Sequence, residues 1–337
     1  MTKAALPSPE LFGLTRRRLI GGAAALGAAS LLTPGRAQAA GRIAVYSTTL
    51  PPVQRRMSEA FTRKTGIQVQ SLRLPTSPLA QRFLAEQQAG QQLCDVVTLG
   101  HDIFFRNISE AGYLAEISDI PGVATLPPAW RSGERFATIL IAPQSIGYNT
   151  NLVKGDAIPK GWRDLLKPEF KDQIIFSDPR ANETVVIFMA ALHDAFGDDF
   201  FRGLRQQNLR MVPSVPQGIE QVIAGEAKIM LPTLAMNMIQ YQGRNAPVAI
   251  IPTPSPTSGT YFFSGVVANA PNPEGARLWY EFVLSREGQE ILCLDNGISP
   301  LGEIPGALKP PADFVAPPLE EAVRRASHLY DLLGLAA

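Results

Sequence analysis

The sequence has little of the side-chain chemistry on which most hydrolases and metalloproteins depend. Its 337 residues include only two cysteines and three histidines. The chain contains no His-Glu-x-x-His zinc motif, no Gly-x-Ser-x-Gly nucleophile motif and no paired carboxylates in a recognisable catalytic context. These absences argue against a hydrolase, and we expect a protein that is not an enzyme.

Long apolar runs, internal repeats and an excess of basic residues are also missing. No stretch after residue 40 approaches the roughly 20 apolar residues of a membrane-spanning helix, and no repeat of about 20 to 50 residues is found. Residues 1–39 hold five basic residues and one acidic residue, so the net charge of +1 for the whole chain becomes −3 for the remainder. A weakly acidic chain predicts no nucleic-acid partner and no polybasic membrane contact.

The first 40 residues have the layout of a cleavable export signal. The basic cluster Arg16–Arg18 precedes a weakly apolar run at 19–32, and a small-x-small site follows at 37–39. The consecutive arginines resemble a twin-arginine signal. The run is short and rich in Ala and Gly, which argues against a permanent anchor. We therefore expect residues 1–39 to be removed and the mature protein to begin near Ala40 in the periplasm; an uncleaved anchor is the alternative.

The two cysteines admit two interpretations. Cys94 leads into an apolar strand pattern and Cys293 lies in an apolar helix pattern, which favours two buried free thiols. The oxidising compartment allows one disulfide instead, and the sequence does not give their separation. A metal site is not expected, because no histidine stands at ligand spacing from them.

Strand and helix patterns alternate along the mature chain. The first 60 residues of the mature chain, 41–100, predict strands at 42–47, 67–72 and 95–99 with helices between them. This order predicts a parallel sheet covered by helices. About 300 residues exceed one typical core, so two lobes are expected. The patterns at 136–142 and 145–150 predict a crossing between lobes, and 261–268 predicts the return.

Between these crossings a second α/β series is expected. Its strands are predicted at 174–177, 209–212, 228–231 and 248–251, and its helices at 182–196, 198–206, 217–224 and 233–241. Helices at 272–284, 286–294 and 318–333 are expected to complete the first lobe. The first lobe then comprises residues 41–142 and 264–337, and the second comprises residues 143–263. Ligands of such α/β folds bind at the carboxyl ends of the strands.

Several segments in this order resemble one known family. They are VYSTT (45–49), DVVTLGHD (95–102), IGYNTNLV (146–153), PKGWRDLLKPEFKDQIIFSDPR (159–180), GIEQVIAGEAKIML (218–231) and YFFSGVVANAPNPEGARLWYEFVLSREGQEIL (261–292). Together they are similar to periplasmic solute-binding proteins of ABC importers, a group that includes ferric-ion, thiamine, aminoethylphosphonate and sugar-phosphate binders. The resemblance covers nearly all of residues 41–333.

The resemblance implies a two-lobed α/β fold of the type II periplasmic-binding-protein class, hinged by two crossing segments. It implies lobes that close on a small-molecule solute and then present a surface to a membrane permease. We expect a monomer without a cofactor. The sequence does not separate transport from a sensing role.

In the first lobe, the candidate ligand-binding residues follow strand ends. They are Ser47, Thr48, Thr49, Ser77, His101 and Asp102. The hydroxyls at 47–49 precede a helix N-terminus, where they and free backbone N–H groups suit an anion; helix capping is the alternative. Ser77 is expected to cap the next helix or to bind. His101 and Asp102 either bind a cationic group or a water, or cap the helix that follows.

In the second lobe and at the crossing, the candidates are Ser145, Arg180, Asn182, Thr184, Ser214, Gln217, Thr233 and Asn237. Arg180 follows a strand and is expected to clamp a carboxylate or phosphate at two points, with Asn182 and Thr184 as further donors. The alternative is a surface arginine beside a helix cap at Asn182. His193 and His328 fall within helix patterns and are assigned structural roles.

The ferric-ion branch of the family supplies a test of ligand type. For a ferric-ion binder, the resemblance implies two adjacent tyrosines directly after the strand at 228–231, because phenolates are hard anionic ligands for Fe(III). Here the segment from Thr233 to Asn237 has none, and Tyr241 stands alone. We therefore expect no metal and a small polar, anionic organic solute that bears phosphate, phosphonate or carboxylate. A ferric-ion carrier of the same fold is the alternative, and an exported hydrolase a weaker one.

Overall fold

The computed structural model describes residues 41–251, 254–294, 296–310, 313–314 and 317–336. The expected export signal lies outside these residues. In the described ranges, no helix has the length and apolar character needed to cross a membrane.

Three parallel strands form the sheet of the first lobe. They are β1 (Arg42–Ser47), β2 (Gln68–Arg73) and β3 (Val96–Leu99), in the order β2-β1-β3. Helices α1 (Pro51–Thr65) and α2 (Thr76–Gln88) connect them. Helix α1 buries Val53, Met57 and Phe61 at helical spacing and ends at Gly66, whose φ of 77° is the left-handed conformation that glycine favours. The predicted parallel β-α-β-α-β order is confirmed.

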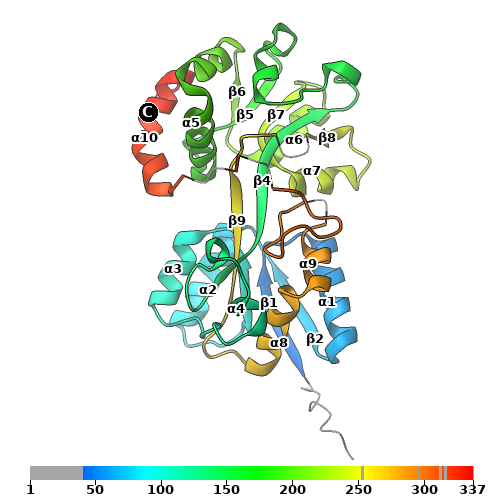
Figure 1. Ribbon diagram of the computed structural model, residues 1–337, viewed down its shortest axis with the longest axis vertical. Helices are drawn as coiled ribbons and strands as arrows, with labels where there is room; N and C mark the ends of the chain where they lie inside the picture. The colour runs from blue at the N-terminus through cyan, green and yellow to red at the C-terminus, as the bar shows by residue number, and fades with distance from the viewer. Residues whose placement is uncertain (1–40, 252–253, 295, 311–312, 315–316, 337) are drawn as a thin grey trace, which may run out of the picture. The chain divides into compact units, whose positions relative to one another are not determined.

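Two long strands connect the lobes. Strand β4 (Ala137–Asn149) pairs through its first half with β9 (Gly259–Val266), and through its second half with β7 (Ile229–Leu234) and β8 (Val248–Ile250). Strand β9 also pairs with β3 of the first lobe. Figure 1 shows both strands running from one lobe to the other. The two strand patterns that the sequence predicts at 136–142 and 145–150 are therefore one continuous crossing strand.

The second lobe repeats the α/β arrangement. Strand β5 (Ile174–Ser177) lies parallel between β6 (Arg210–Val212) and β7. Its helices are α5 (Glu183–Gln206), α6 (Val215–Ile223) and α7 (Ala235–Gln242). Helix α5 is broken at Gly197, where φ is 70° and ψ is −174°. This kink corresponds to the boundary between the two helices predicted at 182–196 and 198–206.

The remaining elements are short helices and the helices near the C-terminus. They are α3 (Asp102–Glu110), α4 (Pro121–Ala124), α8 (Pro273–Val283), α9 (Arg286–Leu292), α10 (Leu319–Leu333) and the 3-10 turns η1 (Pro128–Trp130), η2 (Gly155–Ala157), η3 (Trp162–Leu166) and η4 (Pro168–Phe170).

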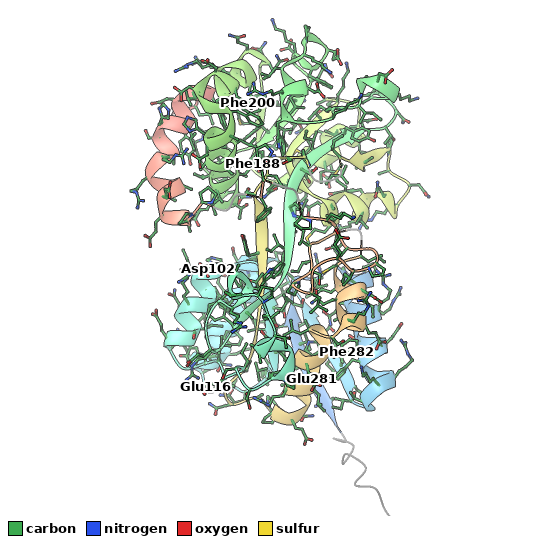
Figure 2. The ribbon with its side chains drawn as sticks, in the orientation of Figure 1. Asp102, Glu116, Phe188, Phe200, Glu281 and Phe282 are labelled. Carbon is green, nitrogen blue, oxygen red and sulfur yellow. The ribbon has the colours of Figure 1, made fainter. Side chains whose placement is uncertain are left out.

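Each lobe has its own apolar core. The first core includes Phe61 and Phe282, and the second includes Phe188 and Phe200. Figure 2 shows Phe282 among the helices around β1, and Phe188 and Phe200 among those around β5. A smaller cluster packs α6 and α7 on the second sheet through residues such as Ile219 and Met238. Two separate cores agree with the expectation of two lobes.

Helix α10 differs from its predicted position. The sequence analysis assigns residues 318–333 to the first lobe, but α10 packs along α5 and places Ala322, Leu329 and Leu332 in the second core. Figure 1 shows the two helices side by side. The prediction was wrong because an amphipathic helix reveals which of its faces is buried, and not which partner buries it. The other lobe boundaries, at 142/143 and 263/264, stay predictions.

Both cysteines are free thiols. Cys94 and Cys293 are fully buried, and each hydrogen-bonds locally, Cys94 to the Val96 carbonyl at 3.2 Å and Cys293 to the Gln289 side chain at 3.3 Å. The interpretation as two buried thiols is thus correct, and the disulfide alternative is not.

Candidate ligand-binding site

Strands β1 and β3 end side by side in the first lobe, and polar residues follow β1. Ser47 lies in register with Thr98, and the Thr48 N–H donates to the Thr98 carbonyl at 3.1 Å. The Ser47 hydroxyl donates to Thr49 Oγ1 at 2.7 Å and accepts from the Thr49 N–H at 3.0 Å. In the described part of the chain, Thr48 Oγ1 is buried without a hydrogen-bond partner. This edge therefore presents one hydroxyl that is free to bind a ligand.

The N-terminus of α1 supplies fewer donors than the sequence analysis expects. Leu50 occupies the N-cap position, no side chain caps the helix, and the first residues are Pro51 and Pro52. Because proline has no N–H group, two of the four free backbone donors of this helix end are missing. This helix end therefore offers an anion fewer backbone donors than a helix that begins without proline.

Ser77 does not cap α2, so that prediction was wrong. The helix begins at Thr76, Pro75 occupies the N-cap position, and no side chain caps it. The ring of Pro75 fixes φ at −58°, and the helix begins at the next residue, before Ser77. Ser77 consequently lies within the first turn, where its side chain is exposed.

His101 and Asp102 both have partners within α3. The Nδ1 atom of His101 accepts the Phe104 N–H at 3.2 Å, so His101 is the N-cap. The Asp102 carboxylate pairs with Arg106 Nε at 2.8 Å. Figure 2 shows Asp102 at the end of the first lobe from which β4 and β9 leave, away from Glu281. His101 therefore has the capping role that was the alternative to ligand binding. Capping uses its Nδ1 atom, and Nε2 is the ring nitrogen that could bind a ligand.

Arg180 follows β5 in the second lobe, as predicted, but its guanidinium already has partners. Nε and Nη2 donate to the Asp178 carboxylate at 2.9 and 2.7 Å, and Nη1 donates to the Ala336 carbonyl at 3.1 Å. The guanidinium holds the pKa of Asp178 below its ordinary value. The Arg180 side chain is still 41% exposed. An anionic ligand would have to share this arginine with Asp178.

Asn182 and Thr184 form the cap of α5. The Asn182 side-chain oxygen accepts the Thr184 N–H at 3.1 Å and the Thr184 hydroxyl at 2.7 Å. This is the capping role that the sequence analysis gives as the alternative for Asn182. Both side chains are half-buried.

Three buried hydroxyls between residues 143 and 263 lack partners within the described residues, those of Ser177, Thr233 and Ser258. Two of them lie at the carboxyl ends of strands. Ser177 ends β5 with no exposed surface, and Thr233 lies near the end of β7 with 1% exposed. Strands β5 and β7 are parallel neighbours, so both hydroxyls lie at the same edge of the sheet. A buried hydroxyl without a partner costs about 1–3 kcal/mol, which favours a role in binding. Ser177 was not among the predicted residues, although its place at the end of an apolar strand is a signal that could have identified it.

Ser145 lies opposite Thr233 on β4 but has a structural partner. The two residues pair in register across β4 and β7. The Ser145 hydroxyl donates to the Ile251 carbonyl, and the side chain is 3% exposed. Ser145 therefore fixes the crossing strand against β8, and its hydroxyl is used.

The remaining predicted residues lie near helix starts. Ser214 is the N-cap residue of α6 without a side-chain cap bond, and Gln217 lies in the first turn; both are exposed. Asn237 lies in the first turn of α7 and is half-buried. The structure thus brings Ser214, Ser177 and Thr233 to the ends of the neighbouring strands β6, β5 and β7.

A small apolar cavity lies between α1 and the crossing strands. Thr49, Leu140, Met236 and Phe262 are among its lining residues, and its volume is about 10 Å³. This is room for about one water molecule and too little for an organic solute. The strand-end hydroxyls are therefore the features that define the candidate site.

Tyr241 and Tyr330 of the second lobe each hydrogen-bond to a different segment. Tyr241 on α7 donates to Glu220 Oε1 at 3.4 Å, and burial raises the pKa of its phenol. Tyr330 donates to the Pro179 carbonyl at 3.3 Å, and burial raises its pKa as well. Both phenols are therefore protonated near neutral pH in the metal-free protein.

The comparisons with known proteins define the class. The "Putative 2-aminoethylphosphonate-binding periplasmic protein" of Salmonella typhimurium is 26% identical over 242 residues, 68% of each chain. Iron-bound HitA from Pseudomonas aeruginosa has a TM-score of 0.63 and 20% identity over 87% of this chain and 99% of that one. AfuA from Actinobacillus pleuropneumoniae, with bound fructose-6-phosphate, has a TM-score of 0.61 and 19% identity over 88% and 100%.

The fold is therefore that of the two-lobed, type II periplasmic binding proteins. Residues 91–321 match the family described as bacterial extracellular solute-binding protein, and the chain belongs to that family.

Proposed function

We propose that this protein is the periplasmic solute-binding component of an ABC importer, and that it captures a small organic anion bearing phosphate, phosphonate or carboxylate. Family membership makes the chain a solute-binding protein. The observation that carries the ligand class is that three strand-end hydroxyls, on Thr48, Ser177 and Thr233, are buried without a partner among the residues that the structure describes. Hydroxyl donors suit phosphate and carboxylate oxygens.

The names of the relatives agree with this ligand class. The Salmonella typhimurium relative is named for an aminoethylphosphonate, and AfuA binds a sugar phosphate. Ferric ion, the alternative, is the ligand in HitA. That alternative lacks its expected ligands here, because the segment from Thr233 to Asn237 contains no tyrosine. A binding role rather than catalysis is consistent with the family.

A thermal-shift screen of the purified protein tests the ligand class. The panel contains sugar phosphates, aminoethylphosphonate, thiamine and its phosphates, di- and tricarboxylates, polyamines and ferric salts. A ligand at about 100 times its Kd stabilises the native state by about 2.7 kcal/mol. We expect a hit among the organic anions and no purple-red tyrosinate colour with ferric citrate. Stabilisation by iron alone would refute the organic-anion proposal.

A pair of threonine variants then tests the site. Thr233→Val removes the buried, unpartnered hydroxyl and keeps the shape of the side chain, so we expect it to weaken binding of the hit about tenfold, the loss of one hydrogen bond of about 1.4 kcal/mol. Thr65→Val, at the other end of α1 from Thr49, is the control, because the Thr65 hydroxyl bonds within its own helix at 2.8 Å. Equal affinities of the two variants would remove Thr233 from the site.

A further inference from the structure

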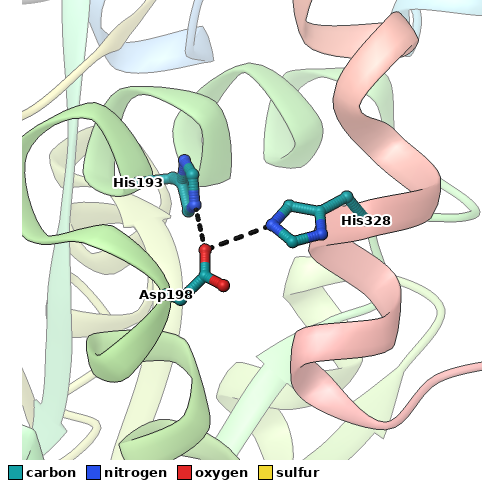
Figure 3. Close-up of side chains that lie close together, drawn as sticks. All are labelled: His193, Asp198 and His328. Atoms are coloured by element: carbon teal, nitrogen blue, oxygen red, sulfur yellow. Dashed lines mark hydrogen bonds and ion pairs between the residues drawn. The ribbon is translucent and has the colours of Figure 1, made fainter.

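Three metal-ligating side chains meet at the contact between α5 and α10. His193 Nε2 lies 2.7 Å from Asp198 Oδ1, and His328 Nε2 lies 3.1 Å from the same oxygen. All three potential ligand atoms lie within 4.8 Å of one another. Figure 3 shows both imidazole rings directed at the Asp198 carboxylate, His193 from α5 and His328 from α10. None of the three residues is among the candidate ligand-binding residues at the strand ends.

The break in α5 places Asp198 beside His193. The two residues are five apart, a spacing that a continuous helix does not bring to one face. Gly197 interrupts the helix with a φ of 70° and turns the chain so that the Asp198 carboxylate faces His193. Glycine adopts this conformation without strain. The third member comes from a segment 130 residues later, so the cluster exists only when α10 is docked.

We infer that His193, Asp198 and His328 form a binding site for a divalent first-row transition metal ion such as Zn²⁺ or Ni²⁺. Two imidazole nitrogens and one carboxylate oxygen are a donor set that these ions favour. Zinc–ligand distances of about 2.0–2.2 Å place ligand atoms about 3.3 Å apart in a tetrahedral site. The observed spacings of 2.7 and 3.1 Å to Asp198 would widen by about 0.6 and 0.2 Å to reach this value.

The site is accessible to solvent. The side chain of His328 is 55% exposed, that of Asp198 is 33% exposed and that of His193 is 20% exposed. Metal binding requires each neutral imidazole to present the lone pair of Nε2, so the proton of each ring moves to Nδ1 through solvent.

The positive charge of Arg325 lowers the affinity of the site for a metal ion. Its Nη2 donates to His193 Nδ1 at 2.7 Å and also lies 2.6 Å from Asp194 Oδ1. When Nδ1 of His193 carries the proton, the contact with Arg325 is lost, and the guanidinium keeps Asp194 and, at 3.7 Å, Glu321 as partners. Arg202 neutralises the other Asp198 oxygen at 2.7 Å. Two guanidinium groups therefore limit the affinity, and removing Arg325 strengthens binding.

Calorimetric titration of the purified, untagged, chelator-treated protein with ZnCl₂ or NiCl₂ tests this site. We expect one ion per chain. His328→Ala should weaken binding by more than about 100-fold, since even the loss of a residue that only supports a ligand costs 10–100-fold. Arg325→Gln removes a cation and supplies an acceptor for the Nδ1 proton of His193, so binding should tighten about tenfold.

Controls separate this site from other sources of metal binding. His101→Ala removes the remaining histidine of the chain and should leave the metal titration unchanged. Thermal unfolding without metal confirms that each variant is folded. Absence of binding up to about 1 mM metal, or equal binding by wild type and His328→Ala, overturns the inference. Neither result bears on the organic solute, which binds elsewhere.

Discussion

Arg180 and Asp178 form a two-point ion pair at the end of β5, with Nε–Oδ1 and Nη2–Oδ2 distances of 2.9 and 2.7 Å. Asp178 directly follows Ser177, whose side chain is buried. An anion that enters here meets a guanidinium already held in a fixed orientation by a carboxylate. Such an arrangement positions the arginine and also competes with the ligand for it.

The first prediction separates these two effects. Arg180→Ala should weaken binding of the organic anion by about 2 kcal/mol or more, the loss of a charge-assisted hydrogen-bonded pair. Asp178→Asn should strengthen it, because the guanidinium loses its competitor. Isothermal titration calorimetry measures both, with Arg55→Ala on the exposed surface of α1 as the control. Unchanged affinity in Arg180→Ala would remove this residue from the site.

The second prediction concerns the stability of the ligand-free protein. Ser177→Ala should raise the free energy of unfolding by about 1 kcal/mol, because it removes a buried hydroxyl that has no partner. Ser264→Ala is the matched control. Ser264 is equally buried but bonds Thr98 Oγ1 at 2.8 Å, so its loss should destabilise. Denaturant unfolding gives both values, and a destabilised Ser177→Ala would show that its hydroxyl is satisfied in solution.

The sequence predicted the strands and most helices because burial patterns repeat within each element. The apolar run at 174–177 is β5, and the helix patterns separated by Gly197 are the two arms of α5. Partners distant in sequence were not predicted. Nothing in residues 318–333 indicates that their apolar face contacts α5 rather than the first lobe.

The candidate site was predicted less completely for the same reason. Positions after strand ends were identified correctly, since strand ends can be read from the sequence. Whether each side chain is already hydrogen-bonded depends on spatial neighbours that the sequence does not specify. Ser145 is bonded to a carbonyl 106 residues away, whereas Thr233, its partner in register, is not bonded. His193 and His328, assigned structural roles from their helix patterns, meet only because α10 docks on α5.

The third prediction is a pH dependence. Hydrogen bonds from His193 and His328 lower the pKa of Asp198 from its ordinary 3.8 to about 2. A folded-state pKa below the unfolded value means that the carboxylate stabilises the protein above about pH 4, and that this contribution is lost as the pH falls through 2. Asp198→Asn should therefore lower the melting temperature at pH 6 and have a much smaller effect near pH 2. Asp199→Asn, whose side chain is 97% exposed, is the control. A constant difference across this range would contradict the assignment.

The fourth prediction concerns the thiols. Burial raises the pKa of Cys293 to about 12 and that of Cys94 well above its ordinary value, so neither forms the reactive thiolate in the folded protein. We expect no reaction with Ellman's reagent under native conditions and two equivalents of thiol in guanidinium chloride. Absence of thiol after denaturation, restored by a reductant, would indicate a disulfide.

The fifth prediction tests the position of α10. Leu329 has no exposed surface and packs in the second core, so Leu329→Ala should lower the free energy of unfolding by about 2–5 kcal/mol. Val323 lies on the same helix and is 50% exposed; Val323→Ala should change it by no more than about 0.5 kcal/mol. The segment after α10 also contacts the loop that follows β5, because the Ala336 carbonyl accepts a hydrogen bond from Arg180 at 3.1 Å. Release of α10 in Leu329→Ala should therefore also reduce solute affinity, whereas a helix packed on the first lobe would leave the loop undisturbed. Denaturant unfolding and solute titration of the two variants distinguish these outcomes.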